Sequence, residues 1–163
     1  MAQSGEDVPA DYQALPRKHL SRKSKVESQD HLMQLTMNTF RFEKLEVWQQ
    51  ARKLNRKIYD CTRGFPDEER YALMSQIRRA SVSVASNIAE GSGRNSDVDF
   101  SRFLEISYGS LMEVISQLYL ALDEKYIKEV QMQEISVAAH GLSAQIIALS
   151  RALGRQPRRT EGK

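Results

Sequence analysis

Residues 78–96 read RRASVSVASNIAEGSGRNS, and the apolar spacing of this stretch is helical. Ala80, Val84 and Ile88 recur four residues apart, which places them on one face of an α-helix. Serine, alanine and glycine fill most of the other positions, and short hydroxyl side chains can bond to their own helix backbone. Because small side chains let two helices approach closely, this stretch predicts a tightly packed helix.

Three further amphipathic segments flank this helix, and none of the chain has the alternation of a strand. We expect four helices, over residues 43–63, 67–90, 97–124 and 128–153. Gly64 suits a left-handed cap after the first helix, Gly91 and Gly93 would close the second, and Ser96 with Asp99 resembles a capping box for the third. Short connections favour antiparallel neighbours, so the sequence predicts an all-α, antiparallel up-down-up-down four-helix bundle.

The composition divides the chain of 163 residues into one folded domain and two tails. Residues 1–38 lack periodicity and predict a disordered or loosely ordered extension, in which Met37 is a candidate internal start. Residues 39–154 form the predicted bundle domain, and residues 155–163 form a basic C-terminal tail, an arm for nucleic acid or only a solubilising segment. No signal pattern or membrane-spanning run is visible, so we expect a cytoplasmic protein without a membrane partner.

The candidate catalytic groups do not form a recognisable site. The three histidines are His19, His31 and His140, and the single cysteine, Cys61, falls on the apolar face of the first helix, where a buried thiol is inert. The glycines at 91 and 93 lack the strand and the lysine of a phosphate-binding loop. We therefore expect no catalytic residues, no metal, no cofactor and no enzymatic activity.

Basic residues provide the best candidates for a binding site. Arg52, Lys53, Arg56 and Lys57 share the polar arc of the first helix, where they could hold phosphates or simply form a solvated face with nearby carboxylates. Further candidates on and after the second helix are Arg78, Arg79 and Arg94. For Arg78 and Arg79 the alternative is structural: an arginine that pairs with a carboxylate across a helix interface.

Exposed apolar residues indicate self-association. Ile106 and Leu120 lie away from the apolar stripe of the third helix, where a single chain would cover them poorly. The polar side of the second helix adds small and polar positions, so that the predicted oligomer interface comprises Ser83, Ser86, Asn87, Glu90, Ile106 and Leu120. Sedimentation as a monomer at micromolar concentration would contradict this prediction.

Two segments together resemble a known family. They read FEKLEVWQQARKLNRKIYDCTRGFPDEERYALMSQIRRASVSVASNIAEGSGR at residues 42–94 and FLEISYGSLMEVISQL at residues 103–118. The chain is similar, over about residues 40–127, to the small four-helix-bundle proteins encoded in intervening sequences of bacterial large-subunit ribosomal RNA genes. Its most specific points are Leu45–Val47–Trp48, Phe65–Pro66, residues 76–80, residues 87–91 and Gly109–Ser110–Leu111 with Glu113.

The resemblance implies a homo-oligomer, with a ring-like pentamer favoured. That family looks similar in turn to accessory proteins of diversity-generating retroelements, which implies RNA, DNA and a reverse transcriptase as partners. We therefore expect a non-catalytic accessory protein that binds nucleic acid through Arg52, Lys53, Arg56, Lys57, Arg78, Arg79 and Arg94. The alternative is an oligomeric protein-interaction scaffold with no nucleic-acid role.

Overall fold

The computed structural model of the chain describes residues 40–154. The extension predicted over residues 1–38, the candidate start at Met37 and the tail at 155–163 lie outside the described residues. The long elements are α2 (Glu46–Cys61), α3 (Leu73–Ser92), α4 (Asp97–Asp123) and α5 (Glu129–Gly154). Three short 3-10 helices, η1 (Arg41–Lys44), η2 (Thr62–Gly64) and η3 (Asp67–Tyr71), precede and follow α2. Residues 40–154 contain no strand, and the all-α prediction is confirmed.

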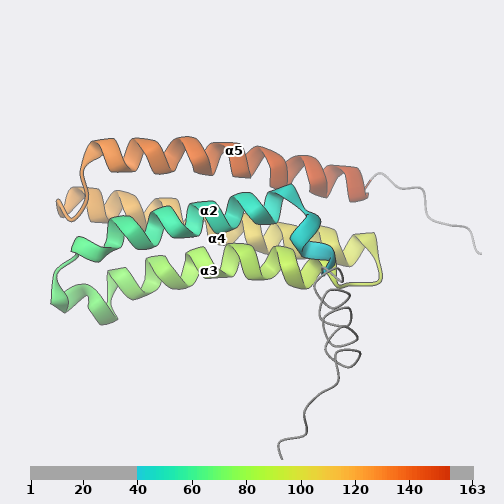
Figure 1. Cartoon of the computed structure of the whole chain (residues 1–163), viewed down its shortest axis with the longest axis horizontal. Helices are drawn as coiled ribbons and strands as arrows, with labels where there is room; N and C mark the ends of the chain where they lie inside the picture. The colour runs from blue at the N-terminus through green and yellow to red at the C-terminus, as the bar shows by residue number, and fades with distance from the viewer. Residues whose placement is uncertain (1–39, 155–163) are drawn as a thin grey trace, which may run out of the picture. The chain divides into compact units, whose positions relative to one another are not determined.

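The four long helices pack side by side as a bundle (Figure 1). Each contacts its two neighbours in the order α2, α3, α4, α5, and α5 closes the bundle against α2. The contact between α3 and α4 is the most extensive, and α2, with 16 residues, is the shortest of the four. The predicted four-helix bundle is therefore confirmed, with α2 resting on a closer-packed group of three longer helices.

Small residues of α3 produce the close contact with α4. The Ser107 hydroxyl on α4 donates a hydrogen bond of 2.9 Å to the backbone oxygen of Val84, and the hydroxyls of Ser83 and Ser110 lie 2.8 Å apart. At Gly91 the two helices are so close that a Cβ atom there would meet the Phe103 Cβ at 2.6 Å. The small side chains of the serine-rich stretch thus allow the backbones of α3 and α4 to approach each other closely.

The first two helices are shorter than the sequence predicted. The segment expected over residues 43–63 divides at Leu45, whose extended backbone separates η1 from α2. The segment expected over residues 67–90 divides at Ala72, where η3 ends and α3 begins one residue later. The carboxylate of Glu69 accepts a hydrogen bond of 2.9 Å from the backbone N–H of Leu73 and so satisfies one free donor of this new helix end.

The helix ends confirm one predicted signal and correct two. The Ser96 hydroxyl accepts the backbone N–H of Asp99 at 3.1 Å, as a capping residue should. No glycine in residues 40–154 has a positive φ, so the left-handed cap predicted at Gly64 is wrong, and Gly64 ends the 3-10 helix η2. Gly91 lies inside α3, which continues to Ser92, and only Gly93 stands at the helix end.

The α4–α5 turn uses a left-handed residue that the sequence did not mark. Lys125 has a φ of 62°, directly after the last residues of α4. The backbone N–H groups of Lys125 and Tyr126 donate to the carbonyls of Leu122 and Ala121 at 2.9 and 2.8 Å. This pair of bonds is the Schellman arrangement, in which glycine is the usual residue at the left-handed position.

Candidate nucleic-acid interface

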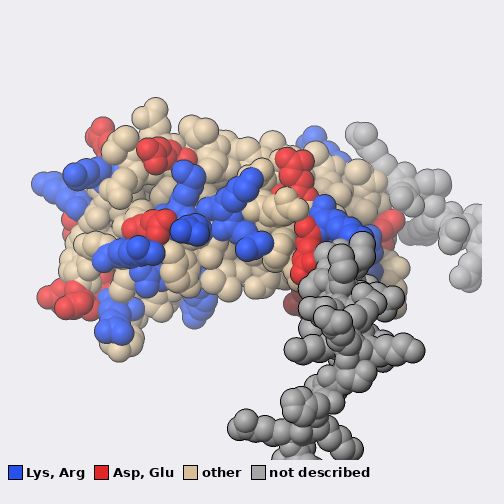
Figure 2. Space-filling model, viewed as in Figure 1, with Lys and Arg blue, Asp and Glu red and all other residues tan. Residues whose placement is uncertain are grey.

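Charge is unevenly distributed between the two halves of the bundle. Helices α2 and α3 together carry six basic and three acidic side chains, a balance of +3. Helices α4 and α5 carry two basic and seven acidic side chains, a balance of −5. In Figure 2, Lys and Arg side chains gather across the middle of the face on which α2 lies. The bundle therefore has a basic side although its total charge is small.

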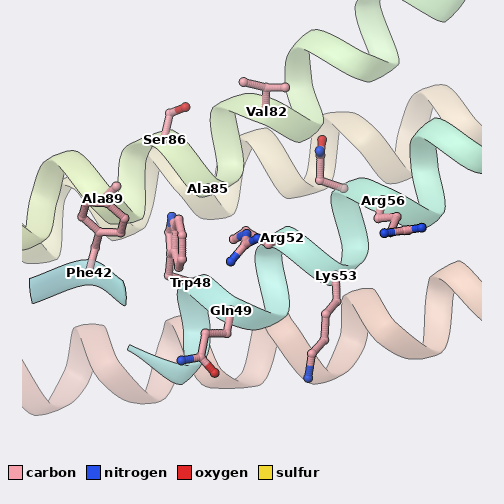
Figure 3. Close-up of a pocket in the computed structure, with 11 residues that line it drawn as sticks. Phe42, Trp48, Gln49, Arg52, Lys53, Arg56, Val82, Ala85, Ser86 and Ala89 are labelled. Carbon is pink, nitrogen blue, oxygen red and sulfur yellow. The ribbon is translucent and has the colours of Figure 1, made fainter. Parts of the chain in front are cut away.

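A groove between α2 and α3 occupies this basic side. Its first hollow has a volume of about 820 Å³. From α2 it is lined by Trp48, Arg52 and Arg56, and from α3 by small residues that leave the space open, as Figure 3 shows. These small lining residues are Val82, Ala85, Ser86 and Ala89.

Aromatic rings and a guanidinium group meet at one end of this hollow. The Phe42 and Trp48 rings pack edge to face, with centroids 4.6 Å apart. The Arg52 guanidinium lies over the Trp48 ring, 4.9 Å from its centroid. This geometry is that of a cation–π pair, and it holds the charge of Arg52 at the groove.

A second hollow, of about 480 Å³, continues the groove toward η3. Val82 lines both hollows, so the two are adjacent along α3. The pattern of the first hollow recurs here: Arg78 lies over the ring of Tyr59 at 4.8 Å, and Arg70 over the ring of Tyr71 at 5.8 Å. We call the two hollows together the α2/α3 groove.

The charges of the groove have one sign. Each hollow is lined by three cations, and neither is lined by a carboxylate; the cations are Arg52, Lys53, Arg56, Arg70, Arg78 and Arg79. The two carboxylates of α2 are engaged elsewhere, since Asp60 pairs with Arg63 at 3.0 Å and Glu46 accepts from Gln145 at 3.4 Å. Within residues 40–154, none of the six cations lining the groove forms an ion pair with a carboxylate.

Arg78 has a structural partner that differs from the predicted one. Its Nε donates a hydrogen bond of 2.9 Å to the hydroxyl of Thr62, a fully buried residue that itself donates to the Ile58 carbonyl at 2.9 Å. Among residues 40–154, neither Arg78 nor Arg79 pairs with a carboxylate, so the ion pair expected across a helix interface is absent there. A hydroxyl of η2 takes that role for Arg78, while Arg79 donates to the side chain of Gln76 on its own helix.

The remaining predicted cations lie partly outside the groove. Lys53 extends from α2 toward α5 in Figure 3, and it lines a further hollow between these helices together with Lys57. Arg94, after the end of α3, pairs with Glu90 and lies over the Phe103 ring at 4.6 Å. The structure thus brings together five of the seven predicted cations and leaves Lys57 and Arg94 apart.

Sequence reasoning missed the aromatic part of the groove. Trp48 packs partly buried against the core, yet its ring also lines the groove. Phe42, Arg70 and Tyr71 lie in short 3-10 helices, where the α-helical period cannot predict which side chains share a face. The one available signal was the pairing in sequence of an aromatic residue with a nearby arginine, as in Arg70–Tyr71.

The predicted oligomer residues fall on different surfaces. Ile106 and Leu120 are each 53% exposed on α4, as expected from their positions. Ser83 is half-buried, where it contacts Ser110 and accepts from the Asn87 amide at 3.0 Å. Two of the six, Ser86 in the groove and Glu90 beside Arg94, lie on the exposed side of α3.

Two features of residues 40–154 bear on reactivity: the placement of metal-ligating side chains and the state of the Cys61 thiol. No group of three or more His, Cys, Asp or Glu side chains within residues 40–154 is placed to hold a metal ion. Burial raises the pKa of the Cys61 thiol to about 11, and the thiol donates to the Ile58 carbonyl at 3.2 Å. A thiol in that state is protonated at neutral pH and is a poor nucleophile. None of the helices in this part of the chain is long and apolar enough to cross a membrane.

The fold and the groove define a class of protein: an all-α four-helix bundle with one basic face. A model of the family described as 23S rRNA-intervening sequence protein matches residues 43–148. The chain therefore belongs to the family of 23S rRNA-intervening sequence proteins, which confirms the resemblance drawn from its motifs.

A solved structure supports the same fold. It is a protein with unknown function from the S23 ribosomal protein family of Bacteroides thetaiotaomicron, with a TM-score of 0.60 and 22% sequence identity. The similarity covers 64% of this chain and 98% of that protein. At 22% identity it supports the fold and not a shared function. A search among curated proteins finds no match.

Proposed function

We propose that this protein binds RNA or DNA without catalysing a reaction, and that the α2/α3 groove is the binding surface. The observation that carries the proposal is the set of six cations lining the groove with no carboxylate among them. Binding a phosphate backbone releases counterions and needs positive charge rather than a sequence-specific geometry. The charges of residues 40–154 balance overall, and positive charge is concentrated on one face.

The test is a comparison of two double variants of the full chain. Arg52→Gln with Arg56→Gln removes two groove cations that make no ion pair within residues 40–154. The control, Arg102→Gln with Lys128→Gln, changes the net charge equally at exposed positions on α4 and just before α5, where Arg102 pairs with Asp99 at 3.5 Å. The probe is a fluorescently labelled single strand of about 16 nucleotides, as RNA and as DNA.

We expect the groove variant to bind at least about tenfold more weakly than the wild type at low salt, and the control to bind nearly as well as the wild type. Equal losses in the two double variants would show that only net charge matters and would contradict the assignment to the groove. No binding by the wild type to either strand would remove the proposed function itself.

A second candidate function is that of an oligomeric interaction scaffold, as an accessory to other proteins in the cytoplasm. It is favoured by the apolar side chains that α4 and α5 expose: Ile106, Leu120, Val130 and Val137. All four lie on α4 and α5, the acidic half of the bundle, and Val137 also lines the hollow between α5 and α2. Self-association through α4, including the ring-like pentamer that the family resemblance implies, is therefore compatible with nucleic-acid binding through α2 and α3.

The oligomer would also increase the affinity of a modest site. Repeating one groove on several subunits raises the effective concentration of the second contact once the first has formed. For an oligomer, the affinity for a long strand should exceed the affinity for a short strand by a factor larger than the ratio of the two strand lengths. The proposed reverse-transcriptase partnership stays an expectation from the resemblance, and the groove adds no argument for it.

A further inference from the structure

We propose that the α2/α3 groove selects unpaired nucleic acid, because it offers aromatic rings for bases as well as cations for phosphates. This inference rests on the proposed function and narrows its ligand to a single strand with accessible bases. In a duplex the bases are stacked on one another, and their faces are not available to a protein ring. A single strand presents those faces, and each base that stacks on an aromatic side chain adds to the affinity.

The arrangement of rings along the groove carries the inference. One end holds Trp48 and Phe42, with the Phe40 ring stacked on Phe42 at 5.7 Å. The other end holds Tyr59 and Tyr71. Guanidinium groups lie over three of the five rings, and the side chains of Arg52 and Arg56 occupy the stretch of α2 between the two ends.

The length of the groove suits a short strand. Trp48 and Tyr59 are eleven residues apart on α2, which corresponds to about 16 Å along the helix axis. That distance accommodates several nucleotides, so bases at the two ends could each meet a ring while the phosphates between them face the arginines. A groove of cations alone would bind a duplex at least as well, because a duplex carries more charge per unit length.

Two of these rings are open to a ligand. Tyr71 is 87% exposed and Phe40 is 69% exposed, although both are large apolar side chains. Burying them within the chain would have stabilised the fold, yet they stand at opposite ends of the groove instead. The Arg70 guanidinium lies 5.8 Å from the centroid of the Tyr71 ring, and the 87% exposure of this side chain leaves most of its surface for a base.

The experiment compares the full-length protein with single-stranded RNA, single-stranded DNA and a hairpin duplex of similar length. Trp48 is the only tryptophan of the chain, so its fluorescence reports directly on the groove. We expect both single strands to bind more tightly than the hairpin, and to quench the fluorescence of Trp48 where the hairpin does not. A difference between the dissociation constants of the RNA and DNA strands identifies whether the groove prefers ribose or deoxyribose.

The variant arm tests the rings themselves. Tyr71→Leu removes the ring from an exposed position, where unfolding is not a concern, and Tyr71→Phe keeps it. We expect the leucine variant to bind the single strand about fivefold or more weakly, and the phenylalanine variant to match the wild type. Hairpin binding should be the same for all three proteins.

Failure of the inference is distinct from failure of the proposed function. Equal affinity for hairpin and single strand, or equal binding by the two Tyr71 variants, overturns the inference while nucleic-acid binding stands. No binding to any of the three probes overturns both. Tighter binding of a polyglutamate peptide, with quenching of Trp48, would mean that the groove accepts an acidic protein segment and would also overturn the inference.

Discussion

A Cβ atom placed on Gly91 of α3 would lie 2.6 Å from the Cβ atom of Phe103 on α4, closer than two such carbons approach in proteins. The same atom would lie 2.7 Å from a ring carbon of Phe100. Since neither neighbour is the far end of a flexible side chain, the helices would have to separate. The glycine is therefore required by packing, although its backbone is ordinary helix.

The first prediction concerns this contact. Gly91→Ala should lower the free energy of unfolding by about 1–3 kcal/mol, because overpacking forces backbone shifts that exceed the gain in helix propensity. Gly109→Ala is the matched control: a Cβ there meets nothing within 4 Å, so the change should stabilise the helix by about 0.5–1 kcal/mol. Urea denaturation measures both, and a neutral Gly91→Ala would contradict the close packing.

The second prediction separates the arginines of the groove by their structural role. Arg78→Gln should lower the free energy of unfolding by about 1 kcal/mol, because it loses the hydrogen bond to the buried Thr62 hydroxyl. Arg79→Gln should be near neutral, since Arg79 is exposed and bonds only to Gln76. Thermal denaturation of the two variants compares them directly. If both are neutral, the Arg78–Thr62 bond does not stabilise the fold.

The third prediction uses the left-handed residue of the α4–α5 turn. Lys125→Gly should stabilise the protein by about 0.5–1 kcal/mol, because glycine adopts a positive φ without the steric cost that lysine has. Lys57→Gly, inside α2, is a control that should destabilise the protein by about 1 kcal/mol, since that position has an ordinary helical backbone. A loss of stability in Lys125→Gly would mean that the lysine side chain itself contributes to the turn.

The fourth prediction concerns alkaline pH. Burial raises the pKa of Cys61 from 9.0 to about 11, so the folded state holds its thiol proton at pH values where the unfolded state has released it. A group of this kind costs no stability below pH 9, and the free energy of unfolding falls as pH rises from about 9 to about 11. Burial also raises the pKa of Tyr126, which adds to the same decline.

Cys61→Ala isolates the contribution of the thiol. The variant should be less stable at neutral pH, because a small cavity remains, but its stability should decline less steeply between pH 9 and 11. Chemical denaturation at a series of pH values provides the slopes. Slopes that are identical in wild type and variant would show that the thiol does not titrate differently in the folded state.

The bundle was predictable because its signal is repetitive. Each helix buries residues at intervals of three and four, such as Val47, Ala51 and Leu54, and this pattern persists over many turns. The Ser96 cap was also predictable, because a serine followed by an acidic residue three positions later is a local signature of a helix N-terminus. Neither feature depends on contacts between distant parts of the chain.

The groove was less predictable because it depends on how α2 sits against α3. The sequence identified Arg52 and Arg56 as a charged arc, but only the fold brings them beside Arg70 and the second hollow. The breaks at Leu45 and Ala72 were missed because neither residue is a helix breaker by propensity. The prediction at Gly64 was wrong because a glycine that follows a helix does not need a left-handed backbone when a 3-10 helix ends the segment.

The most direct test of the central claim is the salt dependence of single-strand binding in the wild type and in the Arg52→Gln, Arg56→Gln variant. The logarithm of the association constant should fall linearly with the logarithm of salt concentration, by about 0.7 per phosphate neutralised on a single strand. If the α2/α3 groove binds the backbone, the variant's slope should be smaller in magnitude by about 1.4, while the Arg102→Gln, Lys128→Gln control keeps the wild-type slope. An unchanged slope in the groove variant would contradict the account, because it would mean that the phosphates contact some other surface.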